Sequence, residues 1–140
     1  MTSIRHIGLV VSNLDRMIDF YCTVFGFNLT SRALETGPYI ETLVGLPGAK
    51  IEWAKLSDSN GLILELLRYH SHPVEPILYP VQRHGCSHIA LTVEDLHATL
   101  TRLEACGGNS GPLQQNPEKT VLVVYARDPE GIVLELVQNL

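Results

Sequence analysis

The chain carries two similar apolar stretches, each with one carboxylate at its centre. The first is Gly61–Leu67 (Gly-Leu-Ile-Leu-Glu-Leu-Leu), and the second, 70 residues later, is Gly131–Val137 (Gly-Ile-Val-Leu-Glu-Leu-Val). Short apolar runs that follow a glycine turn predict buried strands. Because a buried carboxylate without a partner costs several kcal/mol, Glu65 and Glu135 are expected to have a cation or a hydrogen-bond partner. Their equivalent positions suggest one shared site.

The repeat extends to the beginning of each half. The segment His6–Leu14 (His-Ile-Gly-Leu-Val-Val-Ser-Asn-Leu) matches His88–Leu96 (His-Ile-Ala-Leu-Thr-Val-Glu-Asp-Leu) at an offset of 82 residues. An internal repeat predicts the architecture before any single element does. We therefore predict an N-terminal module over residues 1–69 and a C-terminal module over 86–140. Between them, 70–85 is a linker in which three prolines argue against a regular element.

Each module is predicted to follow the order βαβββ, in the α+β class. One helix is capped by Ser12 or Asn13 and runs through Phe25, and the other is capped by Asp95 and runs through Cys106. The predicted strands are Ile4–Val11, Phe27–Arg32, Lys50–Leu56, Gly61–Leu67, Ser87–Val93, Thr120–Ala126 and Gly131–Gln138, with one short edge strand within Asn109–Glu118. The segment Glu35–Leu46 combines turn signals with a short apolar piece and is left unassigned.

Strand periodicity separates the repeated polar residues from the helices. Side chains alternate between the two faces of a strand, so His6 and His88 point away from the apolar residues beside them. The same alternation places Glu65 and Glu135 opposite their leucine neighbours. The helices are therefore expected to cover one face of the sheet, and the two histidines and two glutamates to project from the other face.

These four residues are expected to bind one divalent cation. Two carboxylates repel one another by about 4 kcal/mol at ~4 Å in an effective dielectric near 20. A divalent cation relieves this repulsion, and two neutral imidazoles complete a four-ligand set. The small neighbours Gly8 and Ala90 leave room beside the imidazoles. Ni²⁺, Co²⁺, Mn²⁺, Fe²⁺ and Zn²⁺ remain open, and the alternative is that each polar group is satisfied separately. His70 and His72 of the linker are interpreted as solvated.

Glu52 is a candidate catalytic base. If the second hairpin closes between Arg127 and Ile132, the offset of 70 residues sets Ala54 opposite Glu65. Glu52 would then share the face of Glu65, where a free carboxylate could take a proton from carbon. The alternative is that Glu52 pairs with a lysine of its own strand, because an error of one residue in the turn reverses the face.

Composition excludes several classes of partner. The 140 residues are 45% apolar and 18% charged, which predicts a folded, compact protein. A net charge of −5 without a basic cluster argues against nucleic acid, and no apolar run reaches the length of a membrane span. The three cysteines form no Cys-x-x-Cys pair, so we expect reduced thiols in the cytoplasm.

The repeated motifs resemble the vicinal oxygen chelate superfamily, which includes glyoxalase I, methylmalonyl-CoA epimerase, fosfomycin-thiol transferases, extradiol dioxygenases and bleomycin-binding proteins. The segments that carry the resemblance are His6–Val11, Asp19–Phe27, Ser87–Val93 and Arg127–Glu135. The resemblance implies a cupped, U-shaped mixed sheet with the helices outside, and a homodimer. It also implies that the metal is held on the concave side by His6, Glu65, His88 and Glu135.

The resemblance, together with the ligand set, suggests an isomerase or epimerase. The small-molecule substrate would offer a carbonyl or thioester whose enolate the metal stabilises, with Glu52 and Glu135 as acid–base groups. Glyoxalase-type members usually carry a basic residue for glutathione on the first strand, whereas Gly8–Val11 is uncharged here. The alternatives are a non-haem iron dioxygenase, a thiol transferase, and a metal-free drug-binding resistance protein.

Overall fold

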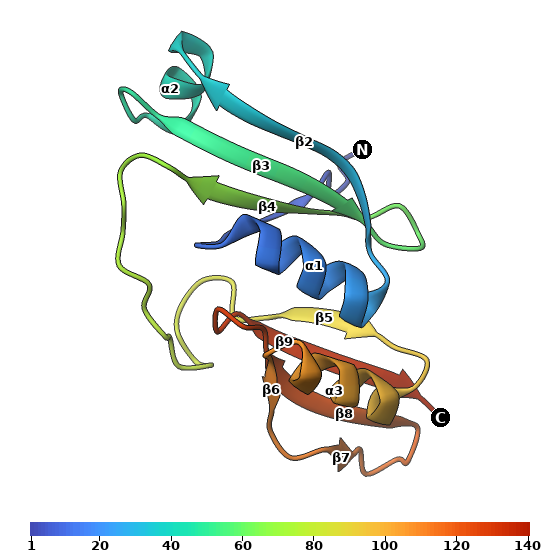
Figure 1. The fold of residues 1–140 in the computed structure, drawn as a ribbon. Helices are drawn as coiled ribbons and strands as arrows, with labels where there is room; N and C mark the ends of the chain where they lie inside the picture. Colours follow the sequence, from blue (N-terminus) through green and yellow to red (C-terminus); the bar gives the residue numbers. More distant parts are fainter. The chain divides into compact units, whose positions relative to one another are not determined.

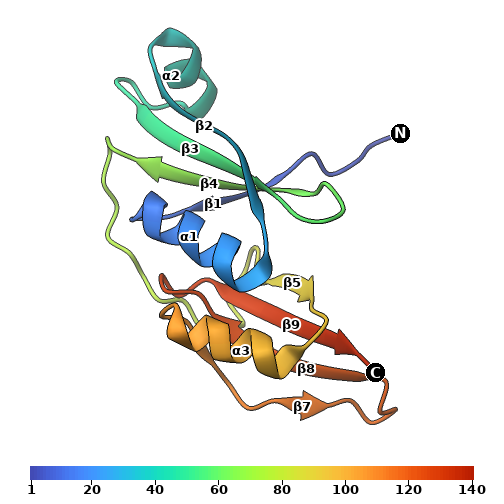
Figure 2. The same cartoon turned by 45° about the vertical axis from the view of Figure 1, so that its right-hand side comes forward.

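A computed structural model describes all 140 residues, which form two compact units. Unit 1 consists of Met1–Cys22 and Gly26–Pro76, and unit 2 of Thr23–Phe25 and Ile77–Leu140. Each unit contains one mixed β-sheet and one copy of the βαβββ order (Figures 1 and 2). The predicted α+β class and the repeated module are confirmed. None of the helices combines the length and apolarity needed to span a membrane.

Unit 1 contains a four-stranded sheet in the order β1-β4-β3-β2. Its elements are β1 (Ile7–Val10), most of α1 (Leu14–Phe25), β2 (Asn28–Thr36), α2 (Pro38–Val44), β3 (Lys50–Ser57) and β4 (Ile63–Tyr69). Strand β1 pairs with β4 in parallel, and the other pairs are antiparallel. His6 therefore lies directly before β1 rather than within it.

Unit 2 repeats this arrangement, with the sheet order β5-β9-β8-β6. Its elements are β5 (Ile89–Thr92), α3 (Leu96–Ala105), β6 (Asn109–Ser110), β7 (Gln114–Gln115), β8 (Val121–Arg127) and β9 (Val133–Asn139). The single predicted edge strand is in fact two short strands, β6 and β7, which both pair with β8. Helix α3 lies across β8 and β9 in both views (Figures 1 and 2).

The two long helices begin where their capping residues predict. The Asn13 side chain accepts a hydrogen bond from the Arg16 N–H, and the Asp95 side chain accepts one from the Ala98 N–H. Each cap satisfies a backbone donor that the first helical turn leaves without a partner. Gly26, with φ 73°, ends α1 in the left-handed conformation that glycine adopts without strain.

Helix α2 was not predicted, and it lies between the two turn signals of the unassigned segment. Pro38 occupies its first turn, and Gly45 ends it with φ 71°. The helix contributes Ile40 to a small apolar cluster, in which Ile40 packs with Ala49 and Ile51. With seven residues, it is too short to show helical periodicity in the sequence.

Both hairpins use the same turn. Asp58 accepts hydrogen bonds on Oδ1 from the N–H groups of Asn60 and Leu62, and Asp128 accepts the equivalent bonds two and four residues later. The flanking pair in the second hairpin is Arg127 with Val133, not Ile132. The predicted register is therefore wrong by one residue, because the aspartate-capped loop is one residue longer than the assumed turn.

The apolar faces of both sheets pack as predicted. Leu64 and Leu66 of β4 are 4% and 0% exposed, and Leu134 and Leu136 of β9 are both fully buried. The glutamate between each pair of leucines points to the opposite face. The carboxylates are therefore held in place by strands whose other side anchors them in the core.

Candidate metal site

The first module brings His6 and Glu65 together. Strand register sets Gly8 beside Glu65, and His6 lies two residues earlier on the same face. His6 Nε2 lies 3.5 Å from Glu65 Oε2, with the side chains 37% and 12% exposed. A Cβ atom at Gly8 would lie 3.3 Å from the Leu67 side chain, so Leu67 already fills the room predicted at this glycine. We call His6 and Glu65 the first pair.

The second module brings His88 and Glu135 together in the same way. His88 Nε2 lies 3.0 Å from Glu135 Oε2, and both side chains are 28% exposed. The other ring nitrogen of His88 is also engaged: Nδ1 lies 2.7 Å from Ser87 Oγ and 3.3 Å from the Tyr125 hydroxyl. The Tyr125 and His88 rings are in contact, with their centroids 5.1 Å apart. We call His88 and Glu135 the second pair.

The separation within each pair is close to that of two ligands that share one cation. Two atoms each about 2.1 Å from a metal, at an angle of 90–110°, lie roughly 3.0–3.4 Å apart. The observed separations are 3.5 Å and 3.0 Å. Neither unit by itself adds a third His, Cys, Asp or Glu to its pair. The donor chemistry of imidazole and carboxylate fits a divalent cation, and each module supplies half of the predicted set.

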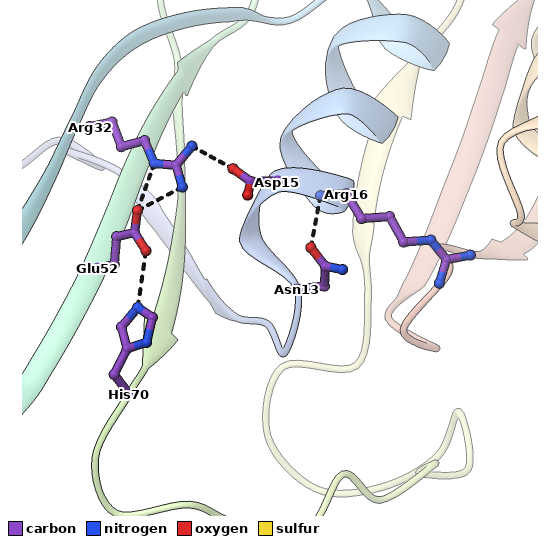
Figure 3. A network of polar contacts seen from close by, with 6 residues as sticks. All are labelled: Asn13, Asp15, Arg16, Arg32, Glu52 and His70. Carbon is purple, nitrogen blue, oxygen red and sulfur yellow. Dashed lines mark hydrogen bonds and ion pairs between the residues drawn. The ribbon is translucent and has the colours of Figure 1, made fainter.

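Glu52 does not share the face of Glu65. The register pairs Lys55 with Glu65 and Glu52 with Arg68, so Glu52 projects from the other side of the sheet. Its Oε2 accepts a hydrogen bond from Arg32 Nε at 2.8 Å and forms an ion pair with Nη2 at 2.6 Å, and its Oε1 lies 3.0 Å from His70 Nε2 (Figure 3). The predicted placement of Glu52 in the site is wrong, because it depended on the incorrect hairpin register.

This network connects several elements of unit 1. Arg32 of β2 also binds Asp15 in the first turn of α1, with Nη1 and Oδ1 2.6 Å apart. The hydrogen bond to His70 and the guanidinium of Arg32 hold the pKa of Glu52 below its ordinary value. The side chain of His70, predicted to be solvated, is instead part of this network. The backbone N–H of His70 donates a hydrogen bond to the Lys50 carbonyl and so continues the pairing of β4 with β3. The network thus links β2, β3 and α1 of unit 1 with the residue that follows β4.

Sequence reasoning missed three residues on the metal-site faces. Lys55 lies opposite Glu65, and Tyr125 lies opposite Glu135 at the position equivalent to Lys55. Trp53 lies two residues from Lys55 on the same face and contacts it. The correct hairpin register would have indicated all three, because cross-strand partners share a face.

The comparisons with known proteins agree with the fold and the repeated motifs. A sequence model described as the Glyoxalase/Bleomycin resistance protein/Dioxygenase superfamily matches residues 3–136. The chain belongs to this superfamily, which confirms the resemblance inferred from the motifs.

The chain is similar along most of its length to several individual proteins. The chain is 33% identical to a probable lactoylglutathione lyase of Vibrio parahaemolyticus, over 97% of this chain and 90% of the relative. It is 30% identical, with the same coverage, to a probable lactoylglutathione lyase of Vibrio cholerae. A crystal structure of a glyoxalase family protein from Bacillus cereus has a TM-score of 0.93 and 26% identity, covering 100% of this chain and 95% of that one.

Proposed function

We propose that the protein is a divalent-metal-dependent enzyme that moves a proton next to the carbonyl group of a small thioester. The observation that carries this proposal is the pair of His–Glu contacts at equivalent positions of the repeat. The four residues that would hold the metal are His6, Glu65, His88 and Glu135. When bound, the metal would act as a Lewis acid that makes the hydrogen beside the carbonyl easier to remove.

Glu135 is the group proposed to carry the proton. Its side chain is 28% exposed, whereas Glu65 is only 12% exposed, so Glu135 has more freedom to reach a substrate. A carboxylate close to the reacting carbon can take a proton from one position and return it to the next. Glu52 is not proposed for this role, because it lies on the other face of its sheet and is bound by Arg32.

Tyr125 and Ser87 are proposed to orient His88. Both hydroxyls lie within 3.3 Å of His88 Nδ1, which leaves Nε2 directed at Glu135. A hydrogen bond to the second ring nitrogen fixes the tautomer and orientation of a metal-binding histidine. In this proposal, these two residues prepare the second pair for its metal.

The names of the relatives suggest the substrate class. Lactoylglutathione is a thioester of an α-hydroxy acid, so it carries a hydrogen and a hydroxyl beside its carbonyl. This agrees with the carbonyl or thioester substrate that the family resemblance implied. We therefore propose that the substrate is an α-hydroxyacyl thioester or the isomer from which one forms.

The proposal is tested by hydrogen exchange in deuterated water. Lactoylglutathione incubated with the protein should gain deuterium on the carbon beside the carbonyl. Exchange should stop when a chelator removes the metal and return when Ni²⁺, Co²⁺, Mn²⁺, Fe²⁺ or Zn²⁺ is restored. Glu52→Gln is the matched control and should exchange at the normal rate, whereas Glu135→Gln should be slower by about 10²–10⁴-fold.

Two results would contradict the proposal. The first is protein that retains no metal after dialysis against any of the five ions. The second is a metal-loaded protein that exchanges no hydrogen in lactoylglutathione or other α-hydroxyacyl thioesters. Oxygen consumption by the Fe²⁺-loaded protein would then favour a dioxygenase on the same scaffold.

A further inference from the structure

The face of unit 1 that carries the first pair also carries a lysine and the single tryptophan of the chain. Lys55 of β3 lies directly opposite Glu65 of β4, and Trp53 lies opposite Leu67. Directly paired residues project from the same face of a sheet. Both Lys55 and Trp53 are half-buried, and the Lys55 ammonium lies 4.8 Å from the centre of the Trp53 ring.

Lys55 has no carboxylate partner. The ion pairs of unit 1 join His6 to Glu65, Arg32 to Asp15 and Glu52, and His70 to Glu52. The carboxylate closest to Lys55 in the strand register therefore contacts an imidazole, while the ammonium rests on an aromatic ring. An ammonium group has three N–H donors, and an aromatic face attracts the charge without accepting three hydrogen bonds. Lys55 thus keeps donors for a ligand.

Lys55 is also the single cation among the strand-paired residues on this face. The first strand, Ile7–Val10, is uncharged. The side chains that share the face of Lys55 on β2 and β4 include Glu35 and Glu65 but no arginine or lysine. An anionic part of a substrate would therefore find its counter-charge at Lys55.

We propose that Lys55, steadied by Trp53, binds an anionic group on the carrier part of the thioester substrate. The shared chemistry is a carboxylate or phosphate attached to a thiol, as in glutathione or coenzyme A. This inference rests on the proposed function, because it assigns the acyl end of the same substrate to the metal ligands. Because Lys55 lies beside Glu65, it would bind the carrier while the carbonyl group of the substrate lies at the His–Glu pairs.

The test measures binding to the metal-free protein, so it does not depend on turnover. Trp53 is the single tryptophan, and its fluorescence reports directly on the ring that contacts Lys55. The probes are S-methylglutathione, its diethyl ester and S-methyl-coenzyme A, and calorimetry gives an independent affinity. The variants are Lys55→Met and Lys55→Arg. Lys50→Met is the matched control, because Lys50 lies on the same strand, five residues from Lys55, and therefore on the opposite face.

We expect Lys55→Met to weaken binding of one acidic probe by about tenfold or more, as the loss of a charged hydrogen bond does. Lys55→Arg should keep most of the affinity, and Lys50→Met should bind as the wild type does. The diethyl ester should not distinguish Lys55→Met from the wild type. If S-methylglutathione shows this pattern, the anion is a carboxylate, and if S-methyl-coenzyme A shows it, the anion is a phosphate.

The proposal is overturned if the wild type binds neither acidic probe, or if Lys55→Met leaves both affinities unchanged. It is also overturned if Lys55→Met weakens the acid and its diethyl ester equally, since Lys55 would then only support the strand. These results are independent of metal content and hydrogen exchange. Failure of the metal proposal alone therefore leaves the anion site measurable, and failure of Lys55 alone leaves the metal proposal intact.

Discussion

The first and second pairs use the same two residue types, yet their surroundings differ. Glu65 is more buried than Glu135, but His6 is the more exposed histidine and lies 3.5 Å from its partner, against 3.0 Å in the second pair. His88 is held through both ring nitrogens. At the position equivalent to Tyr125, which contacts His88, the first module has Lys55.

Both modules therefore contain the His–Glu pair, whereas the residue opposite the glutamate is Lys55 in the first module and Tyr125 in the second. A tyrosine hydroxyl beside an imidazole favours one orientation of a ligand, whereas a lysine on a tryptophan adds a positive charge to the face. We infer that the second module contributes more to metal affinity and the first more to substrate choice.

The largest expected effect compares His88→Ala with His6→Ala. Each removes one proposed ligand and should weaken metal binding by at least about 100-fold. His88→Ala should cause the larger loss. The His88 imidazole is already oriented without the metal, so binding through it costs less conformational entropy than binding through His6. Metal competition with a chromophoric chelator measures both affinities. His72→Ala, in the linker, should bind as the wild type, and equal losses at His6 and His88 would remove the proposed asymmetry.

A smaller effect is expected from Tyr125→Phe, which keeps the ring and removes only the hydroxyl beside His88. Metal affinity should fall by about 10–100-fold, the usual cost of losing a group that orients a ligand. Lys55→Met, at the equivalent position, should change metal affinity by less than about threefold. The Co²⁺-loaded proteins offer a second measurement, because the absorption spectrum should shift in the Tyr125 variant and not in the Lys55 variant.

Glu52→Gln should affect stability and leave the metal site unchanged. Loss of the charge that Arg32 and His70 bind should cost about 1–2 kcal/mol of unfolding free energy, at the lower end for a charged hydrogen bond because the side chains are partly exposed. Urea denaturation measures this loss. A variant with normal stability would show that the network does not hold α1, β2 and β3 together, and weakened metal binding would return Glu52 to the site.

The same network makes part of the stability depend on pH. The pKa of Glu52 is lower in the folded protein, so the charged carboxylate stabilises the fold above the unfolded pKa of about 4.3. This contribution is lost as the pH falls through the folded pKa. The stability difference between wild type and Glu52→Gln should therefore be constant above about pH 5 and shrink below pH 4. A difference that stays constant to pH 3 would contradict the role of the charge.

The smallest expected effect compares the two hairpins. Gly61 and Gly131 have φ values of 85° and 87°, where an alanine is strained, so each substitution should cost about 1 kcal/mol. Gly131→Ala should cost more, because its Cβ would meet the Leu78 side chain at 2.6 Å, whereas nothing lies within 4 Å at Gly61. Thermal unfolding of both variants measures the difference. Equal losses would show that Leu78 moves aside freely.

The repeat, the fold class and the face of the sheet on which Glu65 and Glu135 lie could be predicted from the sequence because they depend on local and periodic signals. Strand alternation separates Glu65 from its leucine neighbours whatever the sheet does next. The helix caps at Asn13 and Asp95 depend on residues within one turn. Two copies of the same signal then support each other.

Only the tertiary structure decided which residues lie across from these glutamates. That choice depends on the hairpin register, and one extra residue in the aspartate-capped loop exchanges the two faces of β3 and β8. In the observed register, Glu52 therefore lies in a network with Arg32, and Lys55 lies opposite Glu65. Helix α2 was decided in the same way, because the packing of Ile40 against Ile51 stabilises a segment too short to form a helix from its own propensity.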